Sequence, residues 1–279
     1  MVVTVAVINM KGGVGKTTLA FNLAWYVAYR RNKKVLLVDL DPQANASQYL
    51  MGVVEYRKHL DQHAPTVFDI FEQFTPTIAP RQEITPESMI KRVKRWTDGS
   101  LIDLVPSLLE LSWTLKNPAS KEHLLAGFLA DVRDKYDLIL LDCPPTESML
   151  TVAAYLASDS VLIPVKPEFL AAIGLPLLVR SLDDFRRSHR TATVQIAGIV
   201  FNDADPSYSY AEHNQARAEV KERALQYGWP VFVNEVRHSR SYPRGARDKT
   251  AIFHTEYARS NVIDEFEAFG KEFAAKVGL

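Results

Sequence analysis

A glycine-rich segment near the N-terminus constrains the fold more than any other feature of the sequence. It reads Met10-Lys-Gly-Gly-Val-Gly-Lys-Thr17 and lies between an apolar, β-branched run at 2–9 and a stretch with helical periodicity at 17–31. Its three glycines let the backbone bend tightly and bring N–H groups close to phosphate oxygens, and the following helix adds its positive N-terminal end. Lys16 should then reach the β- and γ-phosphates of a nucleotide, and the Thr17 hydroxyl should coordinate Mg²⁺. The segment predicts a phosphate-binding loop (P-loop).

Strand-like and helix-like stretches alternate along most of the chain. Short apolar runs that are typical of strands buried on both faces of a parallel sheet occur at 34–39, 101–105, 137–141, 160–165 and 195–201. Helical stretches follow at about 119–134, 148–157, 170–188, 209–227 and 260–277. This alternation predicts an α/β fold of the P-loop NTPase type, with a doubly wound, mostly parallel sheet flanked by helices.

Residues 52–98 interrupt the alternation. They combine mixed charge with four prolines, Pro65, Pro76, Pro80 and Pro86. We interpret the segment as an insertion with short helices, within a single domain that spans residues 1–279.

The overall composition narrows the class of protein. The formal net charge is zero, so affinity for nucleic acid or membrane must come from a local patch. Cys143 is the one cysteine, which excludes a disulfide framework within the chain and fits a cytoplasmic protein. The N-terminus has no basic region or cleavage pattern of a signal peptide, and no apolar run approaches the ~20 residues that span a bilayer.

Carboxylates follow two of the predicted strands. Asp39 and Asp41 stand one residue apart at the end of the run 34–39, and Asp142 ends the run in 136–142. Open α/β sheets bind ligands at the carboxyl ends of their strands. Asp142 is in the position of a Walker B aspartate that holds Mg²⁺, and a carboxylate at Asp39 or Asp41 can hold the metal's water shell or position the attacking water.

Together these segments resemble the ParA/Soj/MinD family of deviant Walker A ATPases, and the ParA branch above all. The resemblance rests on KGGVGKTT at 11–18, VLLVDLDPQANAS at 35–47, YDLILLDCPP at 136–145 and the strand and helix at 160–174. It runs from residue 2 to about 50 and from 100 to 277, and is loose over 52–98. Met10 stands where the usual P-loop has glycine, and Lys11 is the family's additional lysine.

The resemblance implies an ATP hydrolase that depends on Mg²⁺ and closes into an ATP-dependent sandwich dimer. Lys11 would reach the partner's nucleotide, Lys16 would contact phosphate, and Asp41 would orient the hydrolytic water. Thr17, Asp39 and Asp142 would surround the magnesium ion. The implied ATP-binding residues are Lys11, Gly12, Gly13, Val14, Gly15, Lys16, Thr17, Thr18 and Asn202.

The resemblance also implies partners. ATP-bound dimers of the family bind double-stranded DNA without sequence preference, and a ParB-like protein bound to cargo stimulates hydrolysis. The function implied is segregation or positioning of a plasmid, a chromosome or another cargo by a cytoplasmic, nucleoid-associated protein.

A basic stretch at 236–250 is the candidate DNA-binding surface. The stretch contains one acidic residue, Asp248, and five basic ones, which gives a local net charge of 5 − 1 = +4. The basic residues are Arg237, Arg240, Arg244, Arg247 and Lys249. Phosphate-dominated binding needs such a patch and no base-reading motif. A second, diluted cluster comprises Arg180, Arg186, Arg187 and Arg190.

Other functions are also compatible with a variant P-loop. A MinD-like, membrane-cycling regulator of cell division or organelle placement would use an amphipathic C-terminal helix. Here the polar face at 260–277 is acidic, which favours core packing of its apolar face and no membrane binding. A P-loop synthetase or kinase also stays open, whereas an iron–sulfur relative would need two cysteines. The histidines have no metal-ligand spacing, and the pair His59 and His63 lacks matching carboxylates.

Overall fold

A computed structural model describes residues 2–279 except 75–84, 117, 119, 169–170 and 205–210. Its centre is a sheet of eight strands in the order β3-β4-β2-β5-β1-β6-β7-β8. The strands are β1 (Val3–Val7), β2 (Lys34–Asp39), β3 (Lys91–Arg95), β4 (Leu101–Val105), β5 (Leu138–Asp142), β6 (Ser160–Val165), β7 (Gln195–Ala204) and β8 (Val236–Arg237). All neighbours are parallel except β3 and β4. The predicted doubly wound, mostly parallel sheet is confirmed.

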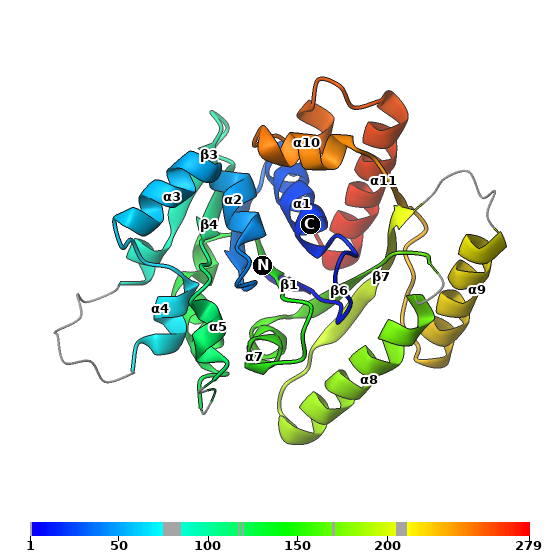
Figure 1. Cartoon of the computed structure of the whole chain (residues 1–279), viewed down its shortest axis with the longest axis horizontal. Helices are drawn as coiled ribbons and strands as arrows, with labels where there is room; N and C mark the ends of the chain where they lie inside the picture. The colour runs from blue at the N-terminus through cyan, green and yellow to red at the C-terminus, as the bar shows by residue number, and fades with distance from the viewer. Residues whose placement is uncertain (1, 75–84, 117, 119, 169–170, 205–210) are drawn as a thin grey trace.

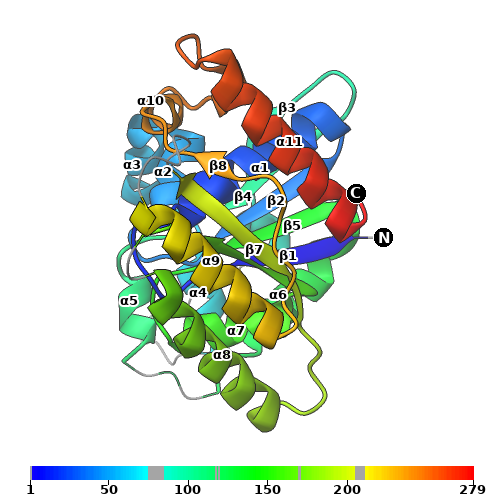
Figure 2. The same ribbon diagram turned by 90° about the vertical axis from the view of Figure 1, so that its right-hand side faces the viewer.

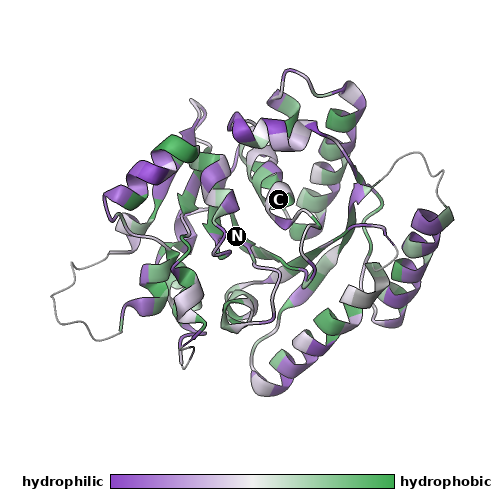
Figure 3. Ribbon diagram, in the orientation of Figure 1, coloured by the Kyte–Doolittle hydropathy of each residue, from purple (hydrophilic) through white to green (hydrophobic). Residues whose placement is uncertain are grey.

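Helices cover both faces of the sheet (Figures 1 and 2). One face carries α1 (Lys16–Arg31) and α11 (Ser260–Val277), which pack on Val5 and Val7 of β1. The other face buries Ala6 and Ile8 under α6 (Leu124–Val132), α7 (Met149–Ala157), α8 (Ala171–Ser188) and α9 (Ala211–Gln226). Successive strand residues point to opposite faces, so a β-branched run builds two cores at once. Figure 3 shows the hydrophobic residues concentrated on the strands and on the helix sides turned toward them.

The insertion at 52–98 contains more than the short helices that the sequence predicts. The helices α3 (Val53–Asp61) and α4 (Val67–Glu72) are present, and α2 (Asn45–Met51) precedes them. The prediction was incomplete because β3 also lies in this segment and pairs antiparallel with β4 at the sheet edge. Lys and Arg dominate β3, a composition that protects an edge strand from pairing with other chains. Pro76 and Pro80 fall outside the described residues.

The C-terminal helix packs as the sequence predicts. Phe266, Phe269 and Phe273 on α11 are fully buried. Their apolar face is part of the core on the α1 side of the sheet. Among the helices of the described residues, none combines the length and apolar character that crossing a bilayer requires.

Strand register brings the predicted carboxylates together. Asp39 at the end of β2 pairs with Asp142 at the end of β5, and Val7 of β1 pairs with Asp142 from the other side. The segment after β1 leads directly into α1. The carboxyl edge of the three central strands therefore forms one site.

Candidate functional site

The backbone of the glycine-rich loop requires glycine at two positions. Gly13 and Gly15 have φ values of 74° and 83°, in the left-handed region that disfavours side chains. A Cβ atom added to Gly15 would also lie 2.1 Å from Nδ2 of Asn202. That nitrogen donates a 2.7 Å hydrogen bond to the carbonyl oxygen of Val14. The end of β7 therefore braces the loop in the conformation that directs it into α1.

Asn9 fixes the start of the loop. Its Oδ1 accepts a 2.9 Å hydrogen bond from the backbone N–H of Lys11, and its Nδ2 donates a 2.7 Å hydrogen bond to the carbonyl oxygen of Pro164. Asn9 is buried, its bond to Pro164 is shielded from water, and its bond with Lys11 is partly buried. The sequence interpretation missed this residue because one of its partners, Pro164, lies on β6, far away in the chain.

Lys16 points into the loop. Its ammonium group donates 3.1 Å hydrogen bonds to the carbonyl oxygens of Asn9 and Lys11. Burial lowers its pKa, and the carboxylate of Asp142 opposes that effect. Within the described residues this buried ammonium group donates to two neutral acceptors, so it is suited to bind an anion such as a phosphate group.

Lys11 lies on the outer side of the loop and forms an ion pair. Its Nζ is 2.5 Å from Oε1 of Glu168, and both side chains are about one-third exposed, 28% and 37%. Lys166 is near the same carboxylate but has Asp203 as its closer partner, at 2.7 Å. The ammonium of Lys11 is therefore at the surface, and its partner Glu168 was not identified from the sequence.

Asp39 is held by a network of hydrogen bonds. Its Oδ2 accepts from the hydroxyl and the backbone N–H of Ser47, at 2.7 and 2.8 Å, and its Oδ1 accepts from the N–H of Asp41 at 3.1 Å. The Ser47 hydroxyl in turn accepts from the N–H of Ser107 at 2.9 Å. Burial nevertheless raises the pKa of Asp39 to about 7. Asp41 is almost as buried, and its Oδ1 accepts a 2.9 Å hydrogen bond from the N–H of Gln43.

Asp142 is fully buried, and neither carboxylate oxygen has a hydrogen-bond partner among the described residues. Burial raises its pKa well above the ordinary value, the nearby Asp39 adds to this, and the Thr17 hydroxyl counteracts it. An ionised carboxylate with so little compensation is costly in a protein interior, and a divalent cation with its bound water would satisfy it. The hydroxyl of Thr17 and the carboxylates of Asp39 and Asp142 are hard oxygen donors, so these residues fit Mg²⁺.

The structure brings most of the predicted nucleotide site together. The loop at 11–18, the three aspartates and Asn202 all lie at the carboxyl edge of the central strands. Thr18 accepts a 2.8 Å hydrogen bond from Asn22 through its carbonyl oxygen, which ties it to the first turns of α1.

The predicted DNA-binding residues form a separate group around α10 (Ser241–Arg247). Arg237 on β8 forms an ion pair with Glu265 of α11, so its charge is already neutralised. The others are exposed and form no ion pair within the described part of the chain: Arg240, Arg244, Arg247 and Lys249. The guanidinium of Arg244 lies 4.2 Å from the ring centre of Tyr257. Arg244 and Arg247 belong to α10, Arg240 is its N-cap residue, and Lys249 follows directly after its C-cap residue.

Two residues that the sequence analysis set aside are structural. Nε2 of His59 lies 3.0 Å from the carbonyl oxygen of Pro65, so this ring forms a hydrogen bond within the insertion. Cys143 is fully buried, and burial raises its thiol pKa well above the usual value, which disfavours a reactive thiolate.

Comparison with known proteins agrees with this geometry. A family model described as an AAA domain matches residues 2–196. The chromosome-partitioning ATPase Soj of Treponema pallidum is 34% identical over 232 residues, which cover 82% of this chain and 80% of that protein. The sporulation initiation inhibitor protein Soj of Bacillus subtilis is 34% identical over 204 residues, 72% of each chain.

Solved structures show the same fold. The ATP complex of a Cyanothece McdA variant superposes with a TM-score of 0.81 at 21% identity and covers 100% of this chain and 97% of that chain. A plasmid partition protein from Borrelia burgdorferi, bound to AMPPNP, superposes with a TM-score of 0.74 at 22% identity and covers 99% and 100%.

Proposed function

The chain belongs to the ParA/MinD superfamily of partition ATPases, and on that premise we propose that it converts ATP and water to ADP and phosphate in an Mg²⁺-dependent reaction at the 11–18 loop. The observation that carries the proposal is the fully buried carboxylate of Asp142, whose oxygens make no regular hydrogen bond within the described residues and which lies near the Thr17 hydroxyl and the buried ammonium of Lys16. A phosphate chain and its cation together satisfy both groups. The loop, the magnesium carboxylates and Asn202 belong to a single domain that spans residues 1–279, and Lys11 of a second copy completes the site.

Each residue in the site has a specific role in this reaction. The N–H groups of Gly12, Gly13 and Gly15 line the phosphates, and Lys16 exchanges its two carbonyl acceptors for phosphate oxygens. When bound, Mg²⁺ neutralises charge on the β- and γ-phosphates. The residues that would hold the ion are Thr17, through its hydroxyl, and Asp39 and Asp142, through their carboxylates.

Asp41 orients the attacking water. Its Oδ1 accepts a hydrogen bond from the N–H of Gln43, which fixes the carboxyl group while the second oxygen stays available to a water molecule. Positioning a nucleophile in this way is the main contribution a protein makes to phosphoryl transfer. Val14, Thr18 and Asn202 maintain the shape of the loop around the nucleotide.

Two copies of the chain close over two ATP molecules. Lys11 is at the surface and is released from Glu168 to reach the phosphates bound by the partner. An ammonium supplied in trans makes hydrolysis depend on dimer formation, in the manner of an arginine finger.

The ATP-bound dimer binds DNA through the exposed basic residues of the α10 region. This contact is to phosphate and independent of sequence, and the dimer doubles the patch. A ParB-like partner stimulates hydrolysis and releases the dimer, so that a plasmid, a chromosome or a protein cargo is segregated or positioned on the nucleoid in the cytoplasm. The names of the Soj and plasmid-partition relatives support this assignment. The burial of the apolar face of α11 gives no support to a membrane-cycling role.

Cosedimentation with DNA tests the proposal. The untagged chain is mixed with DNA of arbitrary sequence in the presence of ATP, ADP or no nucleotide, across a series of salt concentrations. We expect binding with ATP only, with an affinity that falls steeply with salt. Binding that is independent of nucleotide, or no binding at low salt, would refute the DNA-cycling function.

A further inference from the structure

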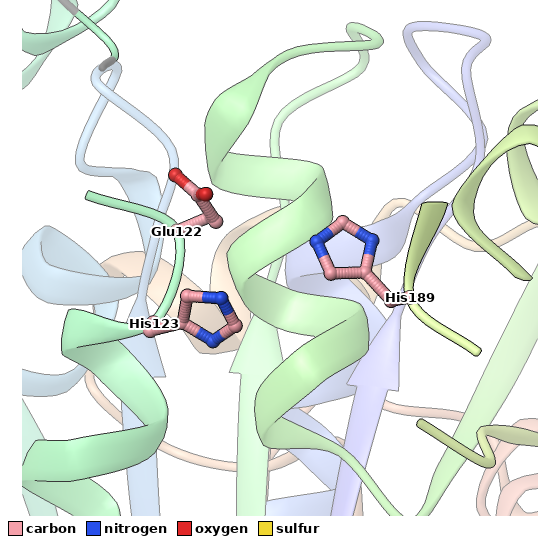
Figure 4. A group of neighbouring side chains, drawn as sticks. All are labelled: Glu122, His123 and His189. Carbon is pink, nitrogen blue, oxygen red and sulfur yellow. The ribbon is translucent and has the colours of Figure 1, made fainter. Parts of the chain in front are cut away.

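Three potential metal ligands lie together at a point where the sequence shows no metal motif. Glu122, His123 and His189 each offer one ligand atom, and these atoms all lie within 4.8 Å of one another. Figure 4 shows Glu122 and His123 on the segment that leads into α6, with His189 facing them from beyond the end of α8. The histidines are far apart in sequence, so the fold alone creates the cluster.

The ring of His189 is oriented for metal binding. Its Nδ1 lies 3.3 Å from the carbonyl oxygen of Phe185, and its ring stacks on the Phe185 ring with 4.9 Å between centroids and 23° between planes. A carbonyl oxygen only accepts hydrogen bonds, so Nδ1 carries the proton and Nε2 keeps its lone pair. A histidine that donates its other ring N–H to a backbone carbonyl is the usual arrangement of a metal ligand.

The opposite side of the cluster is anchored as well. His123 is the N-cap residue of α6, its carbonyl oxygen accepts a 3.0 Å hydrogen bond from Gly127, and its ring centroid is 5.9 Å from that of His189. The preceding Lys121 pairs with Glu72 at 2.7 Å, and both of these side chains are nearly buried. The backbone that carries Glu122 and His123 is therefore fixed, while the three side chains are accessible enough to turn toward a common ion.

We infer that Glu122, His123 and His189 form a binding site for a transition-metal dication of the Zn²⁺ class. Two imidazoles and one carboxylate are a recurrent zinc ligand set that leaves a position for water. Metal–ligand distances of about 2.0–2.2 Å place tetrahedral ligands about 3.3–3.6 Å apart, so modest side-chain rotation closes the present spacing. Mg²⁺ prefers oxygen donors and does not compete well for two imidazoles.

Such a site is separate from the nucleotide site and links α6 to α8. With 18 residues, α8 spans roughly 27 Å, and its other end follows Glu168, the partner of Lys11. A bound ion would cross-link the far end of α8 to the segment before α6, on either side of α7, and would stabilise the folded chain in proportion to metal occupancy.

Metal titration of the untagged, nucleotide-free full chain tests the site. Zn²⁺ is added in competition with a chromophoric chelator, and Co²⁺ is added while its visible absorption is recorded, both with millimolar Mg²⁺ to saturate oxygen-only sites. We expect one equivalent of metal per chain, a Co²⁺ spectrum of imidazole ligation, and a rise in Tm with Zn²⁺. His123→Ala and His189→Ala should each weaken binding by roughly 10- to 100-fold.

His238→Ala is the matched control, because His238 is exposed and also lies beside a carboxylate, Asp203. Binding that is retained in both His123→Ala and His189→Ala, or that His238→Ala abolishes, would overturn the assignment. Wild-type binding of ATP by each variant shows that it is folded and that the loss is local to the metal site.

Discussion

The ammonium nitrogen of Lys11 lies 2.5 Å from a carboxylate oxygen of Glu168 in the same chain. In the proposed dimer the same ammonium contacts the partner's nucleotide. One group cannot make both contacts at once, so the ion pair competes with dimer closure. Its free energy is part of what ATP binding must overcome.

Replacing Glu168 should make dimerisation easier. The pair is about one-third exposed, and such pairs contribute roughly 0.2–1 kcal/mol, so Glu168→Gln should strengthen ATP-dependent dimerisation by about 1.4- to fivefold per protomer. Light scattering during an ATP titration measures the effect, with Glu256→Gln, an exposed glutamate, as control. Weaker dimerisation of Glu168→Gln would mean that Glu168 supports the dimer.

The two loop lysines should have separable effects. Lys16→Ala removes the buried ammonium and should weaken ATP binding by roughly 10- to 150-fold, the effect of losing charged hydrogen bonds. Lys11→Ala should leave ATP binding by the monomer within a few-fold of wild type but abolish the dimer. Fluorescent-nucleotide titration and light scattering distinguish these outcomes. An Lys11→Ala protein that still dimerises with ATP would exclude the proposed contact in trans.

The buried carboxylates should make stability depend on pH when Mg²⁺ is absent. Burial raises the pKa of Asp39 to about 7 and that of Asp142 well above its usual value. Between the unfolded value near 3.8 and about 7, the folded state then binds more protons than the unfolded state. The free energy of unfolding should therefore fall as pH rises from about 4 to about 7.

Asp142→Asn removes one ionisable group of this pair and serves as the test variant. In thermal unfolding with EDTA, the Tm of this variant should decline less steeply from pH 5 to pH 8 than that of the wild type. At pH 8 its Tm should be higher than the wild-type Tm by roughly 2–4 °C for each kcal/mol of unfolding free energy recovered. The same variant should hydrolyse ATP with Mg²⁺ at least about tenfold more slowly than the wild type. Identical pH profiles for wild type and Asp142→Asn would contradict the pKa assignment.

Asp41→Ala should separate dimer formation from hydrolysis. Losing a residue that positions the attacking water should slow ATP hydrolysis roughly 100-fold or more, while Lys11, Lys16 and the magnesium ligands remain. The variant should then accumulate as an ATP dimer in size-exclusion chromatography. Asp41→Asn, which keeps an acceptor for Gln43, controls for loop distortion. If Asp41→Ala stays monomeric with ATP, the assigned role is wrong.

The exposed arginines of α10 should contribute more to DNA affinity than Arg237 does. Arg244→Ala and Arg247→Ala should each lower the slope of log K against log salt by about 0.9 per phosphate contact, and twice that in a dimer. Arg237→Ala should instead lower Tm, because it leaves Glu265 without its partner. Filter binding with ATP measures the slopes, and Arg57→Ala on α3 is the exposed control. Unchanged slopes in the α10 variants would show that DNA binds to another surface of the protein.

The central sheet was predictable because its strands are buried on both faces. Runs such as 34–39 and 160–165 are apolar throughout their interior and leave few alternatives to a parallel strand. The edge strand β3 was not predictable, since Lys91–Arg95 is mostly charged and becomes a strand only by pairing with β4. The two-residue β8 is likewise defined by its neighbour β7.

The candidate site was predictable where local sequence determines it. The spacing of the loop glycines and of the strand-end aspartates in the sequence indicates their roles. Glu168, Ser47 and Asn9 act through partners on other segments, and no local pattern indicates these contacts. The histidine pair at 123 and 189 illustrates the same limit, because only the packing of α6 and α8 around α7 brings the rings together.

The contact between Asn202 and the glycine loop makes residues 188 positions apart in the chain interdependent. The family-model match ends at residue 196, before Asn202, yet the Asn202 side chain occupies the space beside Gly15 and bonds to Val14. A chimaera joined near residue 196 would keep every recognised nucleotide motif and still lose this support if the relative carried a different side chain there. Domain swaps between such ATPases should therefore be joined beyond β7.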